Sequence, residues 1–125
     1  MSSNGEHTRG ENKAQPWASI AAFYQDLTSY GWGHEMLALT QHIISSGAAE
    51  RLFAYTSHAT LKISIYASRV GSTEELTIDF DQKKKSFCFR YYARPIIYEQ
   101  PEFYREYTPE IVAEKFDQFL RWIRW

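Results

Sequence analysis

Four segments between residues 52 and 92 alternate apolar and polar side chains with a period of two, which constrains the fold more than any other feature. The segments lie at about residues 52–57, 61–66, 75–80 and 87–92. A period of two is the spacing of side chains on one face of a β-strand. Strict alternation therefore predicts a sheet with one buried and one wet face, which is typical of antiparallel sheets.

The short connections between these segments predict two β-hairpins. His58-Ala59 separates the first two segments, and the polar stretch 81–85 separates the last two. Connections of this kind join neighbouring antiparallel strands. Residues 94–102 contain two prolines and are expected to form a loop, and residues 103–107 are expected to form a short edge strand.

Apolar residues at helical spacing predict three helices outside the sheet. The first is expected to begin near Pro16 and to end at Gly31, because glycine adopts the left-handed capping conformation freely. The second is expected over residues 34–45. The third is expected to have Thr108 as its N-cap and Pro109 as its first residue.

The same spacing predicts which side of each helix is buried. The predicted inner face of the second helix is Met36, Leu39, Thr40 and Ile43, and that of the third is Val112, Phe116, Phe119, Leu120 and Ile123. On the third helix Asp117 and Arg121 are four residues apart, which is the spacing of an intrahelical ion pair.

The order of these elements predicts an α+β fold with two layers. We expect an antiparallel meander of four to five strands, with two N-terminal helices and one C-terminal helix packed on one face. Residues 15–125 are expected to form a single domain, a size that one domain commonly has. Residues 1–14 have almost no aliphatic side chains and are expected to be a disordered tail.

The charge balance and the single cysteine narrow the classes of function. The net charge is −1, and basic and acidic residues are balanced in both halves, which disfavours a dedicated nucleic-acid binder. Cys88 cannot form an intramolecular disulfide, which suits a reducing compartment. The N-terminus lacks the apolar region of a secretory signal, and no apolar run approaches the roughly 18 residues of a membrane span. We therefore expect a cytoplasmic protein without a membrane partner.

The motifs of common enzymes and cofactor sites do not occur in the sequence. It contains no nucleophile elbow, no P-loop and no dinucleotide-binding glycine pattern. His34-Glu35 begins like a zinc-protease helix, but position 38 is alanine and His42 lies eight residues on, about 12 Å along a helix. Cys88 lies within a predicted strand and is interpreted as structural. We expect no metal, no cofactor and a non-catalytic protein.

Residues 85–92 resemble the RNP1 segment of the RNA-recognition-motif family. The matching residues are Lys85, Phe87, Phe89 and Tyr92, while Ser86 replaces a glycine and Arg90 a valine. The resemblance implies an RNA-binding sheet surface whose aromatic rings stack on bases. The predicted order of elements differs from the family's βαββαβ, so the alternative is that Phe87 and Phe89 face the core.

The leading functional hypothesis is a protein-binding surface on the open face of the sheet, together with the segment 94–107. Tyrosine and arginine dominate protein–protein hot spots. The candidate binding residues are Tyr55, Tyr66, Arg90, Tyr92, Arg94, Tyr98, Tyr104 and Arg105. One concrete version is a small bacterial immunity-type inhibitor. Two alternatives to this hypothesis remain: the partner is a second copy of the chain, in a homodimer, or these aromatic residues only stabilise the sheet.

The alternative function is a small-ligand-binding protein, or an enzyme without a recognisable motif, with a pocket between sheet and helices. The candidate residues for such a pocket are His58, Glu75, Asp79 and Arg90.

Overall fold

The structure is a computed structural model of the 125-residue chain, and it describes residues 14–67, 74–93 and 100–125. These residues form an α+β fold in which two helices precede, and one helix follows, a run of five strands. The elements are α2 (Trp17–Thr28), α3 (His34–Ser45), the short 3₁₀ helix η1 (Ala48–Glu50), β1 (Phe53–Ser57), β2 (Thr60–Ser64), β3 (Glu75–Asp81), β4 (Ser86–Tyr92), β5 (Phe103–Tyr107) and α4 (Val112–Ile123).

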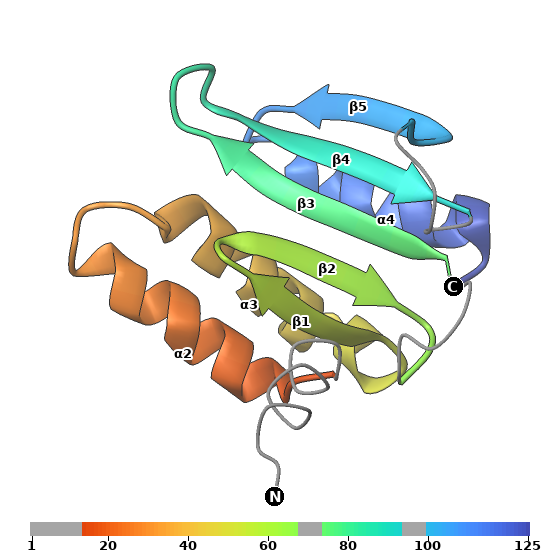
Figure 1. The fold of residues 1–125 in the computed structure, drawn as a ribbon, viewed down its shortest axis with the longest axis horizontal. Coiled ribbons are helices and arrows are strands. Elements are labelled where there is room, and N and C mark those ends of the chain that lie inside the picture. Colours follow the sequence, from red (N-terminus) through yellow and green to blue (C-terminus); the bar gives the residue numbers. More distant parts are fainter. Residues whose placement is uncertain (1–13, 68–73, 94–99) are drawn as a thin grey trace, which may run out of the picture.

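The five strands form one antiparallel meander in the spatial order β1-β2-β3-β4-β5. Both predicted hairpins are confirmed: Ser57 pairs with Thr60, and Asp81 pairs with Ser86. In Figure 1, α3 and α4 lie behind the sheet and α2 lies beside β1. None of the helices in the described ranges crosses the near face of the sheet, and the predicted arrangement of two layers is confirmed.

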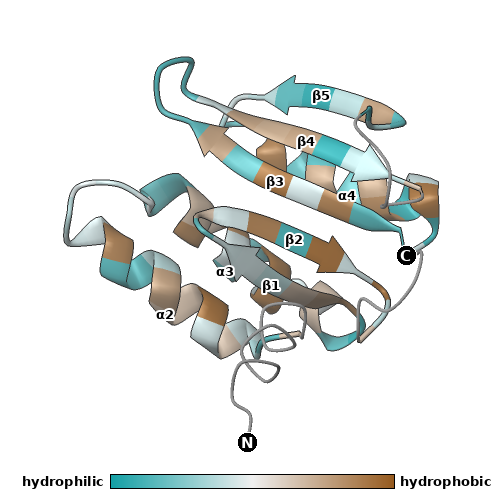
Figure 2. Ribbon diagram, viewed as in Figure 1, coloured by the Kyte–Doolittle hydropathy of each residue, from teal (hydrophilic) through white to brown (hydrophobic). Residues whose placement is uncertain are grey.

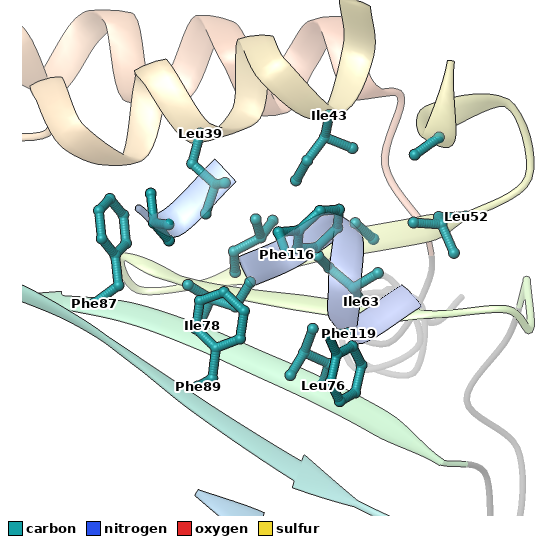
Figure 3. Close-up of a cluster of buried hydrophobic side chains, with 14 of the residues drawn as sticks. Leu39, Ile43, Leu52, Ile63, Leu76, Ile78, Phe87, Phe89, Phe116 and Phe119 are labelled. Atoms are coloured by element: carbon teal, nitrogen blue, oxygen red, sulfur yellow. The ribbon is translucent and has the colours of Figure 1, made fainter. Parts of the chain in front are cut away.

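Hydropathy alternates along β3 and β4, as the change between brown and teal shows (Figure 2), and the apolar residues of this alternation belong to the core. Ile63, Ile78 and Phe89 are fully buried in the resulting core. Phe116 of α4 and Ile43 of α3 project into the same cluster (Figure 3). Each such side chain contributes roughly 1.5–3 kcal/mol through burial. The helical layer is therefore held to the sheet by apolar side chains from both layers.

The second helix has the predicted bounds and the predicted buried face. Met36, Leu39, Thr40 and Ile43 are all buried. The Thr40 hydroxyl donates to the carbonyl oxygen of Met36 at 2.8 Å, which satisfies this polar group inside the core.

The first helix ends at Thr28, three residues before the predicted end at Gly31. The hydroxyl of Thr28 donates to the carbonyl oxygen of Gln25 at 2.6 Å, and that of Ser29 to the carbonyl oxygen of Asp26 at 2.7 Å. Hydroxyls that bond to carbonyls one turn back compete with helix continuation. Gly31 instead lies in the following turn, with φ of +90°.

The last helix begins at Val112, so the predicted start at Pro109 is wrong. The Ile111 N–H donates to the carbonyl oxygen of Thr108 at 3.2 Å, which closes a turn before the helix. The first α-helical bond runs from Lys115 to Ile111 at 3.0 Å. The residues between β5 and α4 connect the sheet layer to the helix layer. The length of this connection depends on the tertiary structure and cannot be predicted from the capping residues.

The two edges of the sheet are formed differently. Beside β1, the Gln15 N–H donates to the carbonyl oxygen of Ala54 at 2.7 Å, and the Gln15 side-chain oxygen accepts from the Thr56 N–H at 3.1 Å. At the other edge, β5 pairs with β4, and no further described residue pairs with it. Within the described ranges, none of the helices is long and apolar enough to cross a membrane.

Candidate functional site

The sheet face that points away from α3 and α4 carries a row of side chains that crosses all five strands. The strand registers place these residues opposite one another in the order Tyr55, Lys62, Thr77, Arg90 and Tyr104. We call them the central row. Directly opposite side chains in an antiparallel sheet lie about 5 Å apart at their Cβ atoms, so the five side chains are neighbours along one line. Within this row Tyr55 and Thr77 are buried.

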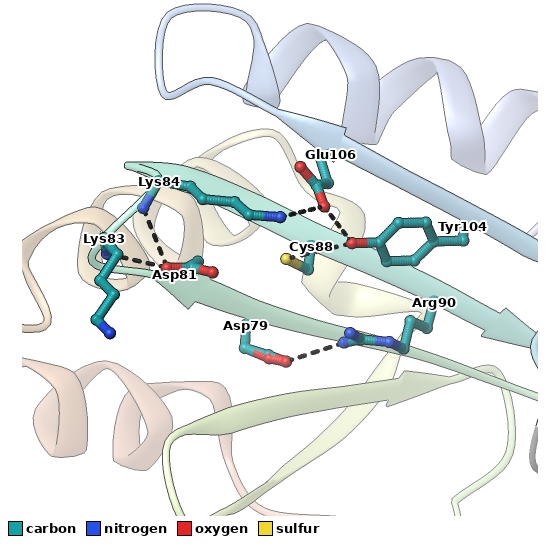
Figure 4. Close-up of polar contacts among 8 residues, drawn as sticks. All are labelled: Asp79, Asp81, Lys83, Lys84, Cys88, Arg90, Tyr104 and Glu106. Carbon is teal, nitrogen blue, oxygen red and sulfur yellow. Dashed lines mark hydrogen bonds and ion pairs between the residues drawn. The ribbon is translucent and has the colours of Figure 1, made fainter.

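Basic side chains on this face are paired with acidic neighbours. The nitrogen–oxygen distances are 3.6 Å for Lys62–Glu75, 3.3 Å for Arg90–Asp79 and 3.3 Å for Lys84–Glu106. Figure 4 shows the last two pairs. Glu75 is 3% exposed, so its pair with Lys62 is shielded from solvent. Binding a phosphate backbone would require these cations to leave their partners, so the face is poorly suited to nucleic acid.

Tyr104 connects two of these pairs. Its hydroxyl donates to the Glu106 carboxylate, and its ring lies under the Arg90 guanidinium, with 5.1 Å between the Arg90 Cζ atom and the ring centroid. The hydrogen bond to Glu106 raises the pKa of the Tyr104 phenol. The same bond, with that from Lys84, lowers the pKa of the Glu106 carboxyl. Tyr104 and Glu106 are thus held in a fixed charge state at neutral pH.

Three aromatic side chains on or beside this face keep substantial exposure. Phe53 is 39% exposed, Tyr66 is 44% exposed and Tyr104 is 39% exposed. The sequence singled out Tyr66 and Tyr104. Phe53 was missed as a site residue, although it lies on the same strand phase as Tyr55, and that phase could have identified it.

The other candidate residues are distributed unevenly. Arg90 and Tyr92 lie on the open face and are partly exposed, and Arg94 and Tyr98 lie outside the described residues. Tyr55 is on this face but is only 7% exposed, so its predicted exposure is wrong. The chain at Ala14 and Gln15 runs beside β1, and Lys62 lies directly opposite, so both sides of Tyr55 are occupied.

Arg105 lies on the helix-covered side of the sheet, because it pairs with the buried Phe89. Its guanidinium lies over the Phe103 ring, 4.8 Å from the centroid. The sequence alone could not fix this side, since both phases of β5 contain tyrosine and a charged residue.

The pocket residues proposed from the sequence do not gather in one cavity. Asp79 and Arg90 form an ion pair on the open face, and Glu75 pairs with Lys62. His58 lies in the turn between β1 and β2, with φ of +59°. Within the described residues, no serine, threonine or cysteine side chain is hydrogen-bonded to a histidine ring, so no nucleophile–base pair forms there.

The RNP1 resemblance is not matched by the sheet geometry. Phe87 and Phe89 are 1% and 0% exposed beneath the helices, where they cannot stack on bases. The alternative prediction, that Phe87 and Phe89 face the core, is confirmed. Cys88 is buried on the opposite face, 3.9 Å from the Tyr104 hydroxyl, which agrees with a structural cysteine.

A second candidate site is a cleft of about 270 Å³ between α3 and α4. It is lined by His34, Glu35, Ala38, Leu39, His42, Phe87, Pro109, Val112 and Ala113. His42 is held by Asp117 of α4, with 2.9 Å between Nε2 and Oδ1, so the expected pairing of Asp117 with Arg121 is replaced by this contact. Across the described ranges, no three histidine, cysteine or acidic side chains come close enough to hold a metal ion.

Comparison with known proteins gives no relative: no protein-family model matches the chain, and neither the curated proteins nor the solved structures include a significant match.

Proposed function

We propose that the chain is a non-catalytic protein-binding module that contacts its partner through the open face of the sheet. The observation that carries the proposal is the exposure of Phe53, Tyr66 and Tyr104 on or beside a face that no described helix covers. Tyrosine side chains supply large contact areas with few rotatable bonds, and they are enriched in interface hot spots.

The locally paired charges support a protein partner over a polyanion. Arg90 and Lys84 already have acidic neighbours, so the face offers alternating charge rather than one basic field. Such a pattern favours a partner surface with complementary alternating charge. A concrete form of this function is a cytoplasmic bacterial immunity-type inhibitor, in which the sheet face covers a toxin.

The test combines affinity capture from native lysate with mapping of the captured partner. The variants Tyr66→Ala and Tyr104→Ala are compared with Tyr30→Ala, a tyrosine outside the sheet that is 77% exposed. For a partner purified after capture, each open-face variant is expected to raise Kd about tenfold, and Tyr30→Ala less than about twofold. The proposal fails if no partner is captured, or if the captured partner binds all three variants equally well.

The cleft between α3 and α4 favours a second candidate function, binding of a small molecule. Its walls are largely apolar, with His34, Glu35 and His42 as polar groups, which is the usual composition of a ligand pocket. The fluorescent probe anilinonaphthalene sulfonate is expected to bind here, and Ala113→Trp, which fills the cleft, is expected to abolish the binding. Equal fluorescence with the filled variant would exclude this site.

A further inference from the structure

The edge formed by β5 lacks the protection that the opposite edge has. Gln15 covers the backbone of β1 through two hydrogen bonds, whereas no described residue pairs with the outer side of β5. The strand Phe103–Tyr107 contains neither proline nor glycine, and its three central side chains are exposed. An edge strand without proline, a bulge within it or a cover is a template for another strand.

The hydrogen bonds at the start of β5 fix which backbone groups point toward β4. The Glu102 N–H donates to the carbonyl oxygen of Tyr91 at 2.8 Å, so that carbonyl points toward β5. Residues two apart on a strand direct their backbone N–H and carbonyl groups to the same side. The backbone groups of Phe89 therefore also point toward β5. Its partner Arg105 therefore directs its own backbone groups toward β4.

The neighbours of Arg105 consequently direct their backbone groups outward. Tyr104 and Glu106 each present an N–H and a carbonyl oxygen at the free edge. A separate observation agrees: the Arg105 guanidinium reaches the carbonyl oxygen of Tyr104 at 2.8 Å, which places this carbonyl at the outer side of the strand. The edge thus offers the N–H groups of Tyr104 and Glu106 and the carbonyl oxygen of Glu106, whereas an incoming strand would have to share the Tyr104 carbonyl with Arg105.

The charges of β5 disfavour pairing with a second copy of itself. In a two-fold antiparallel pair, the registers with substantial overlap centre on residue 104, 105 or 106. The first sets Glu102 opposite Glu106, the second sets Arg105 opposite Arg105, and the third sets Glu106 opposite Glu106. Like charges directly opposite each other destabilise a sheet. The edge therefore fits a strand of different sequence.

Aromatic side chains flank this edge on both sides of the sheet. On the helix side, the Phe103 and Trp122 rings lie 5.4 Å apart between centroids, and Trp122 is 62% exposed. On the open side, Tyr104 continues into the central row. A strand added to β5 would contact both, so it would extend the face of the proposed function.

We propose that β5 is a docking edge for an extended segment of a partner protein, which adds as a sixth antiparallel strand. Complementarity requires a basic side chain opposite Glu106, an acidic one opposite Arg105 and an apolar one opposite Phe103. The proposal rests on the proposed protein-binding function and names its partner chemistry. Main-chain hydrogen bonds would supply affinity, and these three positions specificity.

The test uses a synthetic peptide with the core Val-Lys-Glu-Thr-Val, which places these side chains in antiparallel register. The control peptide, Val-Glu-Lys-Thr-Val, has the same composition with the charges exchanged. In ¹⁵N NMR titrations to about 1 mM, the first peptide is expected to shift the Tyr104 and Glu106 amides and the Trp122 indole. Unmoved amides would overturn the docking edge, and equal shifts with both peptides would overturn the stated partner chemistry.

Backbone substitutions separate strand addition from side-chain contact. Glu106→Pro removes an outward N–H without removing a bond to β4, and it is expected to weaken peptide binding at least about tenfold. The comparison variant Glu106→Gln keeps this N–H and loses only the side-chain charge, so it is expected to weaken binding clearly less than Glu106→Pro does. If Glu106→Pro lowers the Tm, a modified peptide is used with the wild-type protein in its place. This peptide is the first one with methyl groups on its Lys and Thr backbone nitrogens, which blocks their hydrogen bonds to β5. Undiminished binding of the methylated peptide would then contradict the proposal.

The same variants distinguish the two proposals. A captured protein partner that is weakened by Tyr66→Ala but unaffected by Glu106→Pro would leave the proposed function standing and remove the docking edge. If the peptide binds β5 as expected but the captured protein partner is unaffected by Tyr66→Ala and Tyr104→Ala, the docking edge stands and the proposed open-face function is removed.

Discussion

His42 of α3 and Asp117 of α4 join the two helices across the layer, with Nε2 of the imidazole 2.9 Å from Oδ1 and 3.1 Å from Oδ2 of the carboxylate. Both side chains are about one third exposed, so water and salt weaken the contact. We expect a coupling of about 0.5–1 kcal/mol between His42→Ala and Asp117→Asn in a double-mutant cycle of unfolding free energies. A coupling near zero would show that the pair does not stabilise the helix layer.

Gly33 is expected to tolerate a side chain less well than the other two glycines at helix ends. All three have φ between +90° and +93°, which costs an alanine about 1–2 kcal/mol. At Gly33 alone, a Cβ would also lie 2.8 Å from the Cβ of Leu27. Gly33→Ala should therefore destabilise by about 2–4 kcal/mol, against about 1–2 kcal/mol for Gly31→Ala and Gly47→Ala. Equal losses in urea denaturation would contradict the close approach of Gly33 to α2.

Phe116 and Trp122 test the buried and exposed sides of α4. Phe116 is fully buried against Phe89, with 6.5 Å between ring centroids, whereas Trp122 is 62% exposed. Phe116→Ala is expected to cost about 3–5 kcal/mol of unfolding free energy, because it leaves a cavity in the core. Trp122→Ala should cost less than about 1 kcal/mol. Comparable losses would mean that the helix is rotated relative to the sheet.

Alkaline pH is expected to destabilise the fold through buried tyrosines. Burial raises the pKa of Tyr24 above 10.0, and the charge of Asp79 adds to it; burial, with the hydrogen bond to Glu74, raises the pKa of Tyr91. The folded protein keeps these protons where the unfolded chain loses them. The contribution of these tyrosines to the unfolding free energy is complete below about pH 10, the pKa of a tyrosine in the unfolded chain. It is lost as the pH rises from there toward their pKa values in the folded protein.

The Tyr24→Phe variant isolates one of these groups. The Tyr24 hydroxyl donates to the carbonyl oxygen of Ala59 at 3.0 Å, so the variant should lose about 1 kcal/mol at pH 8. Its unfolding free energy should then fall less steeply above pH 10 than that of the wild type. Identical slopes in chemical denaturation at pH 9, 10 and 11 would show that Tyr24 does not contribute.

Much of the local structure was determined by the sequence, because it depends on side-chain spacing over a few residues. The alternation along 75–80 and 87–92 placed Ile78 and Phe89 in the core and Asp79 and Arg90 on the open face. The helical spacing of α3 gave its bounds and its buried face. These features follow from the geometry of one strand or one helix and need no distant partner.

The tertiary structure alone decided features that depend on contacts between distant segments. Gln15 covers the edge of β1, and Tyr55 is buried although its strand phase is the open one. The pairing of β5 with β4 set Arg105 on the helix side and Tyr104 on the open side. Residue periodicity repeats equally well in either phase, so only the register with a neighbouring strand can choose between them.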